Sequence, residues 1–146
     1  MAATFVLDTD VCIDLIRGHV PAEGSESGRV SPAASVISSV TLAELEVGVA
    51  KAPAPSRPRR QLDDFLGQVL VADFDTSAAR HYGEIRAHLE KKGTTIGPLD
   101  LLIAAHARSR SAILVTANLQ EFRRVPGLKC IDWKRTARIG RGRRPR

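Results

Sequence analysis

Short apolar, β-prone stretches alternate with helical patterns along almost the whole chain of 146 residues. Strands are predicted at residues 4–7, 34–38, 69–74, 112–116 and 128–131, and helices at about 10–17, 41–50, 60–68, 75–92, 98–110 and 118–122. Strands that alternate with helices pair in parallel, because each connection must cross a face of the sheet. The pattern therefore predicts an α/β fold, with a mainly parallel, short-stranded central sheet and helices on both faces.

The length and charge distribution predict one folded domain over residues 1–133 and a basic C-terminal tail over 134–146. The tail holds seven Lys or Arg and no acid, whereas the other 133 residues hold 15 basic and 16 acidic side chains, so the net charge of +6 belongs to the tail. No apolar run approaches about 18 residues, so no membrane span is expected. Two cysteines exclude a disulfide scaffold or a Cys-rich zinc module.

Four carboxylates fall where predicted strands end or helices begin: Asp8, Glu44, Asp100 and Glu121. Ligand sites of parallel sheets form at this edge, so we expect the four side chains to converge. Each also has a purely structural interpretation. Thr41 and Glu44 have the spacing of a capping box, Asn118 and Glu121 resemble one, and acids in a first turn favour the helix dipole.

Asp8 and Asp100 are the stronger functional candidates. Asp100 lies in the apolar run 99–105, and Asp8 ends the run 5–7, so each is expected to be buried. A buried carboxylate is costly unless it meets a cation, hydrogen-bond donors or a wet cleft. Carboxylates without paired His or Cys ligands suit Mg²⁺ or Mn²⁺, which prefer oxygen ligands.

Residues beside the fourth acid are supporting candidates. Thr116 and Asn118 lie between the strand at 112–116 and Glu121, where they could orient a water or line a metal site. Arg123 and Arg124 follow Glu121 and could hold phosphates, although a solvated pair explains them equally well.

Other acids of the same helices are expected to have structural roles. Asp10 is assigned to the helix dipole, and Asp14 to an exposed pair with Arg17. Glu46 lies two residues from Glu44, so it points elsewhere and is not expected in the cluster. The segment 18–31, rich in Gly and Ser, is predicted to be a loop or a poorly formed helix.

Several stretches in order resemble PIN-domain ribonucleases, and in particular the VapC toxins of bacterial toxin–antitoxin pairs. The stretches are Leu7-Asp-Thr-Asp10, Ser39-Val-Thr-Leu-Ala-Glu-Leu45, Asp100-Leu-Leu-Ile-Ala-Ala-His-Ala107, Leu114-Val-Thr-Ala-Asn-Leu-Gln-Glu-Phe122, Arg124-Val-Pro-Gly-Leu128 and Asp132-Trp133. The resemblance spans roughly residues 4–133. Segment 18–31 departs from it, since such proteins commonly carry a helix there.

The resemblance implies a PIN-like three-layer α/β/α fold and a cytoplasmic endoribonuclease dependent on Mg²⁺ or Mn²⁺. Its implied partners are an RNA substrate, a cognate antitoxin protein and a second copy of the chain in a homodimer, with no membrane. Asp8, Glu44 and Asp100 match the acidic positions of the family, and Glu121 matches its less uniform fourth position. Asp8 and Asp100 are expected to hold the metal, and Glu44 and Glu121 to complete the site.

Two other functions stay open from the residues. Asp8-Thr-Asp10 after an apolar strand also fits a haloacid-dehalogenase-like phosphatase, with Asp8 as nucleophile and Asp10 as acid. That interpretation needs a later acidic pair at a strand end, and the pair Asp63-Asp64 falls in a helical pattern instead. The other alternative is a catalytically silent RNA-binding module.

Overall fold

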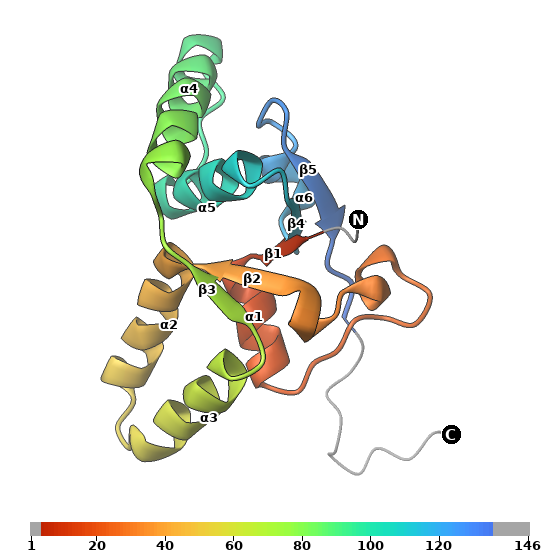
Figure 1. Cartoon of the computed structure of the whole chain (residues 1–146), viewed down its shortest axis with the longest axis vertical. Helices are drawn as coiled ribbons and strands as arrows, with labels where there is room; N and C mark the ends of the chain where they lie inside the picture. Colours follow the sequence, from red (N-terminus) through yellow and green to blue (C-terminus); the bar gives the residue numbers. More distant parts are fainter. Residues whose placement is uncertain (1–3, 136–146) are drawn as a thin grey trace.

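Five short parallel strands form one sheet in the order β3-β2-β1-β4-β5. The computed structural model describes residues 4–135 (Figure 1). The strands are β1 (Phe5–Leu7), β2 (Ser35–Ser38), β3 (Leu70–Ala72), β4 (Ile113–Thr116) and β5 (Lys129–Asp132). All five predicted strands are confirmed, and the sheet is parallel.

Helices cover both faces of this sheet, which confirms the three-layer α/β/α prediction (Figure 1). One layer contains α1 (Thr9–Ile16), α2 (Ser39–Lys51) and α3 (Ser56–Leu66), and the other contains α4 (Thr76–Lys92) and α5 (Pro98–Ser109). The one-turn helix α6 (Leu119–Phe122) follows β4. None of the helices in the described range is long and apolar enough to cross a membrane.

The core has two parts because successive side chains of a strand point to opposite faces. Phe5 and Leu7 of β1 pack with α1, α2 and α3, whereas Val6 between them packs with α4 and α5. All three side chains are buried, as expected for a central parallel strand with helices on both faces. This arrangement fixes the carboxyl end of β1 at the middle of the sheet edge.

The ends of α4 were predictable, but the start of α2 was not. The Asp75 side chain caps α4 by accepting from the Ala78 amide at 2.9 Å, and Gly93 ends the helix in the left-handed conformation at φ +68°. Helix α2 begins at Ser39, directly after β2 ends. The Ser38 hydroxyl caps the helix by accepting from the Val40 amide. The predicted Thr41 cap is therefore wrong.

Helix α3 also begins earlier than residue 60, at Ser56. Its first turn contains Pro58, where an absent amide hydrogen costs nothing because the first-turn amides have no intrahelical acceptor. Pro58 therefore lies inside the helix, whereas Pro53 and Pro55 precede it.

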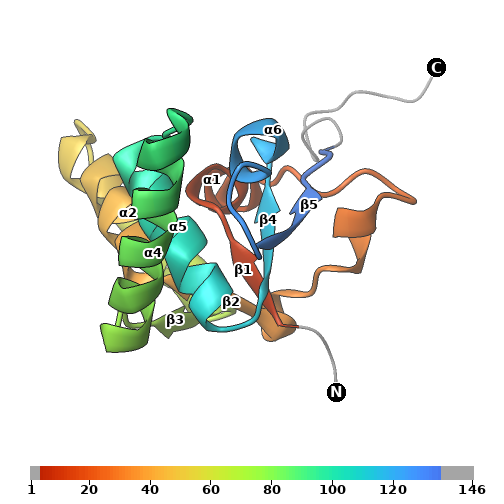
Figure 2. The same cartoon turned by 90° about the horizontal axis from the view of Figure 1, so that it is seen from above.

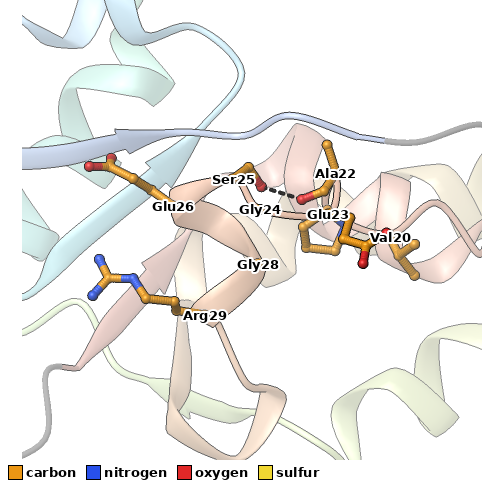
Figure 3. Close-up of a pocket in the computed structure, with 9 residues that line it drawn as sticks. Val20, Ala22, Glu23, Gly24, Ser25, Glu26, Gly28 and Arg29 are labelled. Carbon is orange, nitrogen blue, oxygen red and sulfur yellow. Dashed lines mark hydrogen bonds between the residues drawn. The ribbon is translucent and has the colours of Figure 1, made fainter.

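Segment 18–31 contains no long helix, as predicted. Its regular structure is a single turn of 3₁₀ helix, η1 (Glu26–Arg29), followed by η2 (Pro32–Ala34) before β2. Residues 20–26, 28 and 29 line a hollow of about 900 Å³, in which the Ser25 hydroxyl donates to the Ala22 carbonyl at 2.6 Å (Figure 3). None of the four predicted acids lines this hollow, so it is separate from the candidate site. Most of the predicted basic tail, residues 136–146, lies outside the described part of the chain.

Candidate functional site

Asp8 lies where β1 ends and α1 begins, beside the end of β4. Figure 2 shows β1 and β4 running side by side from the N-terminal side toward α1 and α6. The Asp8 carboxylate accepts from the Thr9 amide at Oδ1 and from the Thr116 hydroxyl at Oδ2, both at 2.8 Å. Asp8 is only 4% exposed, so these two neutral donors from adjacent strand ends fix its orientation.

Glu44 reaches the same edge from α2. The Thr9 hydroxyl donates to Glu44 Oε1 at 2.7 Å, and its oxygen lies 3.3 Å from the hydroxyl oxygen of Thr41. Thr41 is buried in the first turn of α2, so its hydroxyl serves this contact between α1 and α2. The Thr41–Glu44 capping box, the structural alternative for Glu44, is absent, and Glu44 lies in the interior of the helix.

Glu121 is held by the two segments on the other side of the edge. The Gly97 amide donates to Glu121 Oε1 at 3.0 Å, and the Asn118 side-chain amide donates to Oε2. The Asn118 backbone amide donates in turn to the Thr116 hydroxyl at 2.9 Å. Asn118 makes no side-chain cap to α6, so the capping-box alternative is wrong here too, and Asn118 connects Thr116 with Glu121.

Asp100 occupies the first turn of α5, three residues after Gly97, and is half-buried. Burial raises its pKa to about 6, helped by the negative charges of Asp8, Glu121, Glu44 and Asp10 in decreasing order. Burial also raises the pKa of Asp8, although the hydrogen bonds from Thr116 and Thr9 oppose this. The structure therefore brings the four predicted acids into one electrostatic neighbourhood.

No Lys, Arg or His in the described range forms an ion pair with any of these four acids. Glu46 differs, since it pairs with Arg59 of α3, which confirms that it points away from the cluster. Within residues 4–135, no group of three or more His, Cys, Asp or Glu side chains is arranged so that it could hold a metal ion.

This donor set fits a hard divalent cation. Mg²⁺ is usually bound through one or two carboxylates and keeps several waters, so it does not need a protein cage of three ligands. Asp8 has a lone pair left on each oxygen, and the Asp100 carboxylate makes no side-chain hydrogen bond within the described residues. Carboxylates with raised pKa values and no protein cation are stabilised by an added cation.

Asp14 is buried rather than paired at the surface with Arg17. It accepts from Trp133 Nε1 at 2.8 Å and Arg135 Nη1 at 2.7 Å, and His19 Nδ1 lies 3.3 Å away. The prediction failed because these partners include residues more than 100 positions along the chain.

Arg123 and Arg124 both lie exposed just after Glu121. Arg124 Nη1 donates to the Thr95 carbonyl at 3.2 Å, which places it beside the segment that leads to Gly97 and Asp100. Their predicted contact with phosphates stays a prediction.

His106 is a buried polar residue with a role that sequence reasoning missed. It is 1% exposed on α5, and its Nδ1 lies 2.8 Å from the Ser38 hydroxyl that caps α2. Burial lowers its pKa, and the nearby charge of Arg110 lowers it further. His106 thus connects the helix of Asp100 with the start of the helix of Glu44. The available signal was a single His within the apolar run of α5.

Comparisons with known proteins place this arrangement in context. The family model described as "PIN domain" matches residues 5–128. The chain is 44% identical over 129 residues to the tRNA(fMet)-specific endonuclease VapC of Salmonella typhimurium, and the match covers 88% of this chain and 97% of the relative. It is 38% identical to ribonuclease VapC2 of Rickettsia felis, again over 88% of this chain and 97% of the relative. Among solved structures, it is similar to DNA-bound VapBC from Salmonella typhimurium, with 41% identity and a TM-score of 0.79 over 90% of this chain and 99% of the other. VapBC2 from Rickettsia felis bound to promoter DNA has 34% identity and a TM-score of 0.76 over the same shares.

Proposed function

The chain belongs to the PIN-domain family, in its VapC group, and we propose that it is an endoribonuclease that acts as the toxin of a toxin–antitoxin pair. The observation that carries this proposal is the convergence of Asp8, Glu44, Asp100 and Glu121 at one sheet edge without a protein cation. The comparisons favour neither the phosphatase nor the silent module.

The proposed cofactor is Mg²⁺ or Mn²⁺, held by Asp8 and Asp100 directly or through water. When bound, such an ion lowers the pKa of a coordinated water and neutralises charge on phosphoryl oxygens. Asp8 is suited to this role because the Thr9 amide and the Thr116 hydroxyl fix both of its oxygens. Asp100 is suited because its carboxylate is half-buried and faces the charges of the other three acids.

Glu44 and Glu121 would complete the site by positioning the attacking water. The Thr9 hydroxyl orients Glu44, and the Gly97 and Asn118 donors orient Glu121. In-line attack of water on the phosphodiester would leave a 5′-phosphate and a 3′-hydroxyl. Asn118 and Thr116 support this geometry, since they form one chain of hydrogen bonds from Asp8 to Glu121.

The proposed substrate is initiator tRNA. Support comes from the relative of Salmonella typhimurium, which is 44% identical and is named as specific for tRNA(fMet). The neighbouring VapBC structures support a cognate antitoxin as partner. We further propose a homodimer that acts in the cytoplasm, where its RNA substrate is found.

The test is cleavage of tRNA(fMet) and of a mixed elongator tRNA pool by the purified, antitoxin-free chain with Mg²⁺ or Mn²⁺. We expect cleavage of tRNA(fMet) that stops with EDTA and in Asp100→Asn, and cut ends that carry 5′-phosphate. Glu46→Gln is the matched control, since Glu46 pairs with Arg59 away from the cluster. Absence of metal-dependent cleavage of every tRNA offered would reject the proposal.

Two further variants separate the nuclease from the phosphatase alternative. The nuclease requires Glu44 and tolerates the loss of Asp10, so Glu44→Gln is expected to be inactive and Asp10→Asn active. The opposite pattern would favour a phosphatase with Asp10 as its acid.

A further inference from the structure

His106 is a polar side chain in an otherwise apolar part of the core. It lies on α5 between Ala105 and Ala107, which are fully buried, and it is itself 1% exposed. Nε2 of its ring has no hydrogen-bond partner within residues 4–135. A buried polar atom without a partner costs stability, and an apolar side chain would avoid that cost. The imidazole therefore needs a reason other than the packing of the core.

The contacts of this ring all lead to the start of α2. Nδ1 of His106 lies 2.8 Å from the hydroxyl oxygen of Ser38, which accepts from the Val40 amide and caps the helix. The ring also packs edge-on with Phe74, with 5.4 Å between the ring centroids, and the Phe74 amide donates to the Ser39 hydroxyl at 3.0 Å. In Figure 1, α5 lies next to the point where β2 ends and α2 begins. His106 thus fixes the first turn of α2 against α5.

The contact between His106 and Ser38 joins two helices that carry acids of the candidate site. Asp100 lies six residues before His106 on α5, and Glu44 lies six residues after Ser38 along α2. Glu44 also accepts from the Thr9 hydroxyl, but Thr9 belongs to α1 and gives Glu44 no attachment to α5. Since a helix moves as a rigid element, holding the start of α2 against α5 holds the Glu44 carboxylate relative to Asp100.

The ring influences the site through geometry and not through charge. Burial lowers the pKa of His106, and the nearby charge of Arg110 lowers it further, so the imidazole is neutral at pH 7. Within the described residues it makes no hydrogen bond to any of the four acids. It therefore acts on the acids through the residues that it contacts.

We propose that His106 is a positioning residue of the nuclease, which holds the start of α2 through Ser38 and so keeps Glu44 at a fixed position relative to Asp100. The inference rests on the proposed function and assigns a role to a side chain outside the cluster of acids. It also predicts which property suffers when the contact is lost. Glu44 positions the attacking water and depends on α2, whereas the proposed metal ligands, Asp8 and Asp100, lie at the end of β1 and on α5.

The experiment compares two amide variants of the full-length chain. The amide of His106→Asn occupies the place of Nδ1 and can keep the hydrogen bond to Ser38, whereas the longer side chain of His106→Gln carries its amide to the place of Nε2. His81→Asn is the matched control, since His81 Nδ1 accepts from Arg108 Nε of α5 at 2.8 Å but lies on α4, which carries none of the four acids. The measurements are kcat and KM for cleavage of tRNA(fMet), the rise in unfolding temperature with Mg²⁺, and urea denaturation in EDTA.

We expect His106→Gln to lower kcat about tenfold or more, with KM for tRNA(fMet) within about twofold of the wild type. His106→Asn should recover kcat to within about threefold of the wild type, and His81→Asn should leave it unchanged. The rise in unfolding temperature with Mg²⁺ should be the same in all of these proteins, because the proposed metal ligands are not displaced. A purely structural histidine would instead lower stability in EDTA without this split between kcat and KM.

Ser38→Ala removes the same contact without altering the imidazole, so it tests the inference even if His106→Gln is unstable. We expect it to lower kcat by a factor similar to that of His106→Gln. Addition of His106→Gln to Ser38→Ala should then cause little further loss, because both substitutions break one hydrogen bond.

Wild-type kcat in both His106→Gln and Ser38→Ala would overturn the inference. Equal losses of kcat in His106→Asn and His106→Gln, or fully additive losses in the double variant, would overturn it as well, because the hydrogen bond to Ser38 would not be responsible. Loss of the Mg²⁺ effect in His106→Gln would contradict a route through Glu44. Absence of metal-dependent tRNA cleavage by the wild type would reject the proposed function itself, which keeps the two failures distinguishable.

Discussion

Asp8 and Asp14 are both buried carboxylates at helix α1, yet their environments are opposite. Asp8 is 4% exposed and Asp14 is 7% exposed. Burial by itself favours the protonated form of both carboxyl groups. For Asp8 this effect prevails and the pKa is raised, since its donors are neutral and its charged neighbours are acids. For Asp14 the hydrogen bonds from Trp133, His19 and Arg135, together with the charge of Arg135, prevail and lower the pKa.

The difference separates a structural acid from a functional one. Asp14 has a protein cation and an indole donor, so its negative charge helps to attach the segment after β5 to α1. Asp8 and its acidic neighbours have no such cation within the described chain, so the fold bears an unbalanced charge at this edge. Unbalanced charge of this kind marks sites where an external cation or reaction chemistry compensates it.

The largest expected effect is on catalysis at the Asp8 cluster. Asp8→Asn preserves the helix cap, since Asn is as good a cap as Asp, but it removes the charge. We expect single-turnover cleavage of tRNA(fMet) to slow by about a thousandfold or more, because metal-assisted charge stabilisation is worth several kcal/mol. Glu46→Gln should cleave within about twofold of the wild type. Equal rates for Asp8→Asn and the wild type would contradict a functional role for Asp8.

Stability should respond to Asp14. Asp14→Asn weakens charge-assisted hydrogen bonds from Arg135 and Trp133, and we expect a loss of about 2–3 kcal/mol in the free energy of unfolding. Asp100→Asn should be neutral or stabilising in metal-free protein, since it removes a charge that its neighbours repel. Urea denaturation in EDTA measures both. Destabilisation by Asp100→Asn comparable to that by Asp14→Asn would show that the two acids are equally structural.

The two acids should also have opposite pH dependence. The folded-state pKa of Asp100 is about 6, above its ordinary 3.8, so its contribution to stability is fully present below pH 4 and is lost as the pH rises past 6. The lowered pKa of Asp14 gives a contribution that is present above its ordinary pKa and lost on acidification.

Metal-free Asp100→Asn should therefore gain stability relative to the wild type between pH 4 and 7. We expect about 1–2 kcal/mol after allowance for solvent screening of a half-exposed group. Urea titrations at four pH values in EDTA measure this difference. A difference that does not change with pH would contradict the raised pKa of Asp100.

The smallest effect is expected from the neutral donors of Asp8. Thr116→Val removes the hydroxyl that donates to Asp8 Oδ2 and accepts from the Asn118 amide. Loss of such a supporting group costs about tenfold or more in metal affinity or activity. Thr116→Ser retains the hydroxyl and should recover most of the activity. If Thr116→Ser and Thr116→Val lost activity to the same extent, the hydrogen bonds of the Thr116 hydroxyl would not be what supports the site.

The strands and the convergence of the acids were predictable from the sequence, because carboxyl ends of parallel strands share one edge and local apolar patterns mark the strands. The start of α2 was not, since Ser38 and Thr41 are both good caps and only the tertiary contact between Thr41 and Thr9 decides between them. Asp14 was misassigned for the same reason, because Trp133 and Arg135 reach it only in the folded chain.

The most direct test of the account is a Mg²⁺ titration of the thermal unfolding of the metal-free chain, compared with Asp8→Asn and Glu46→Gln. A ligand at about 100 times its dissociation constant stabilises the folded state by about 2.7 kcal/mol. We therefore expect the unfolding temperature of the wild type and of Glu46→Gln to rise by several degrees, and that of Asp8→Asn to stay constant. An equal rise in Asp8→Asn, or no rise in the wild type, would contradict a metal site at this edge.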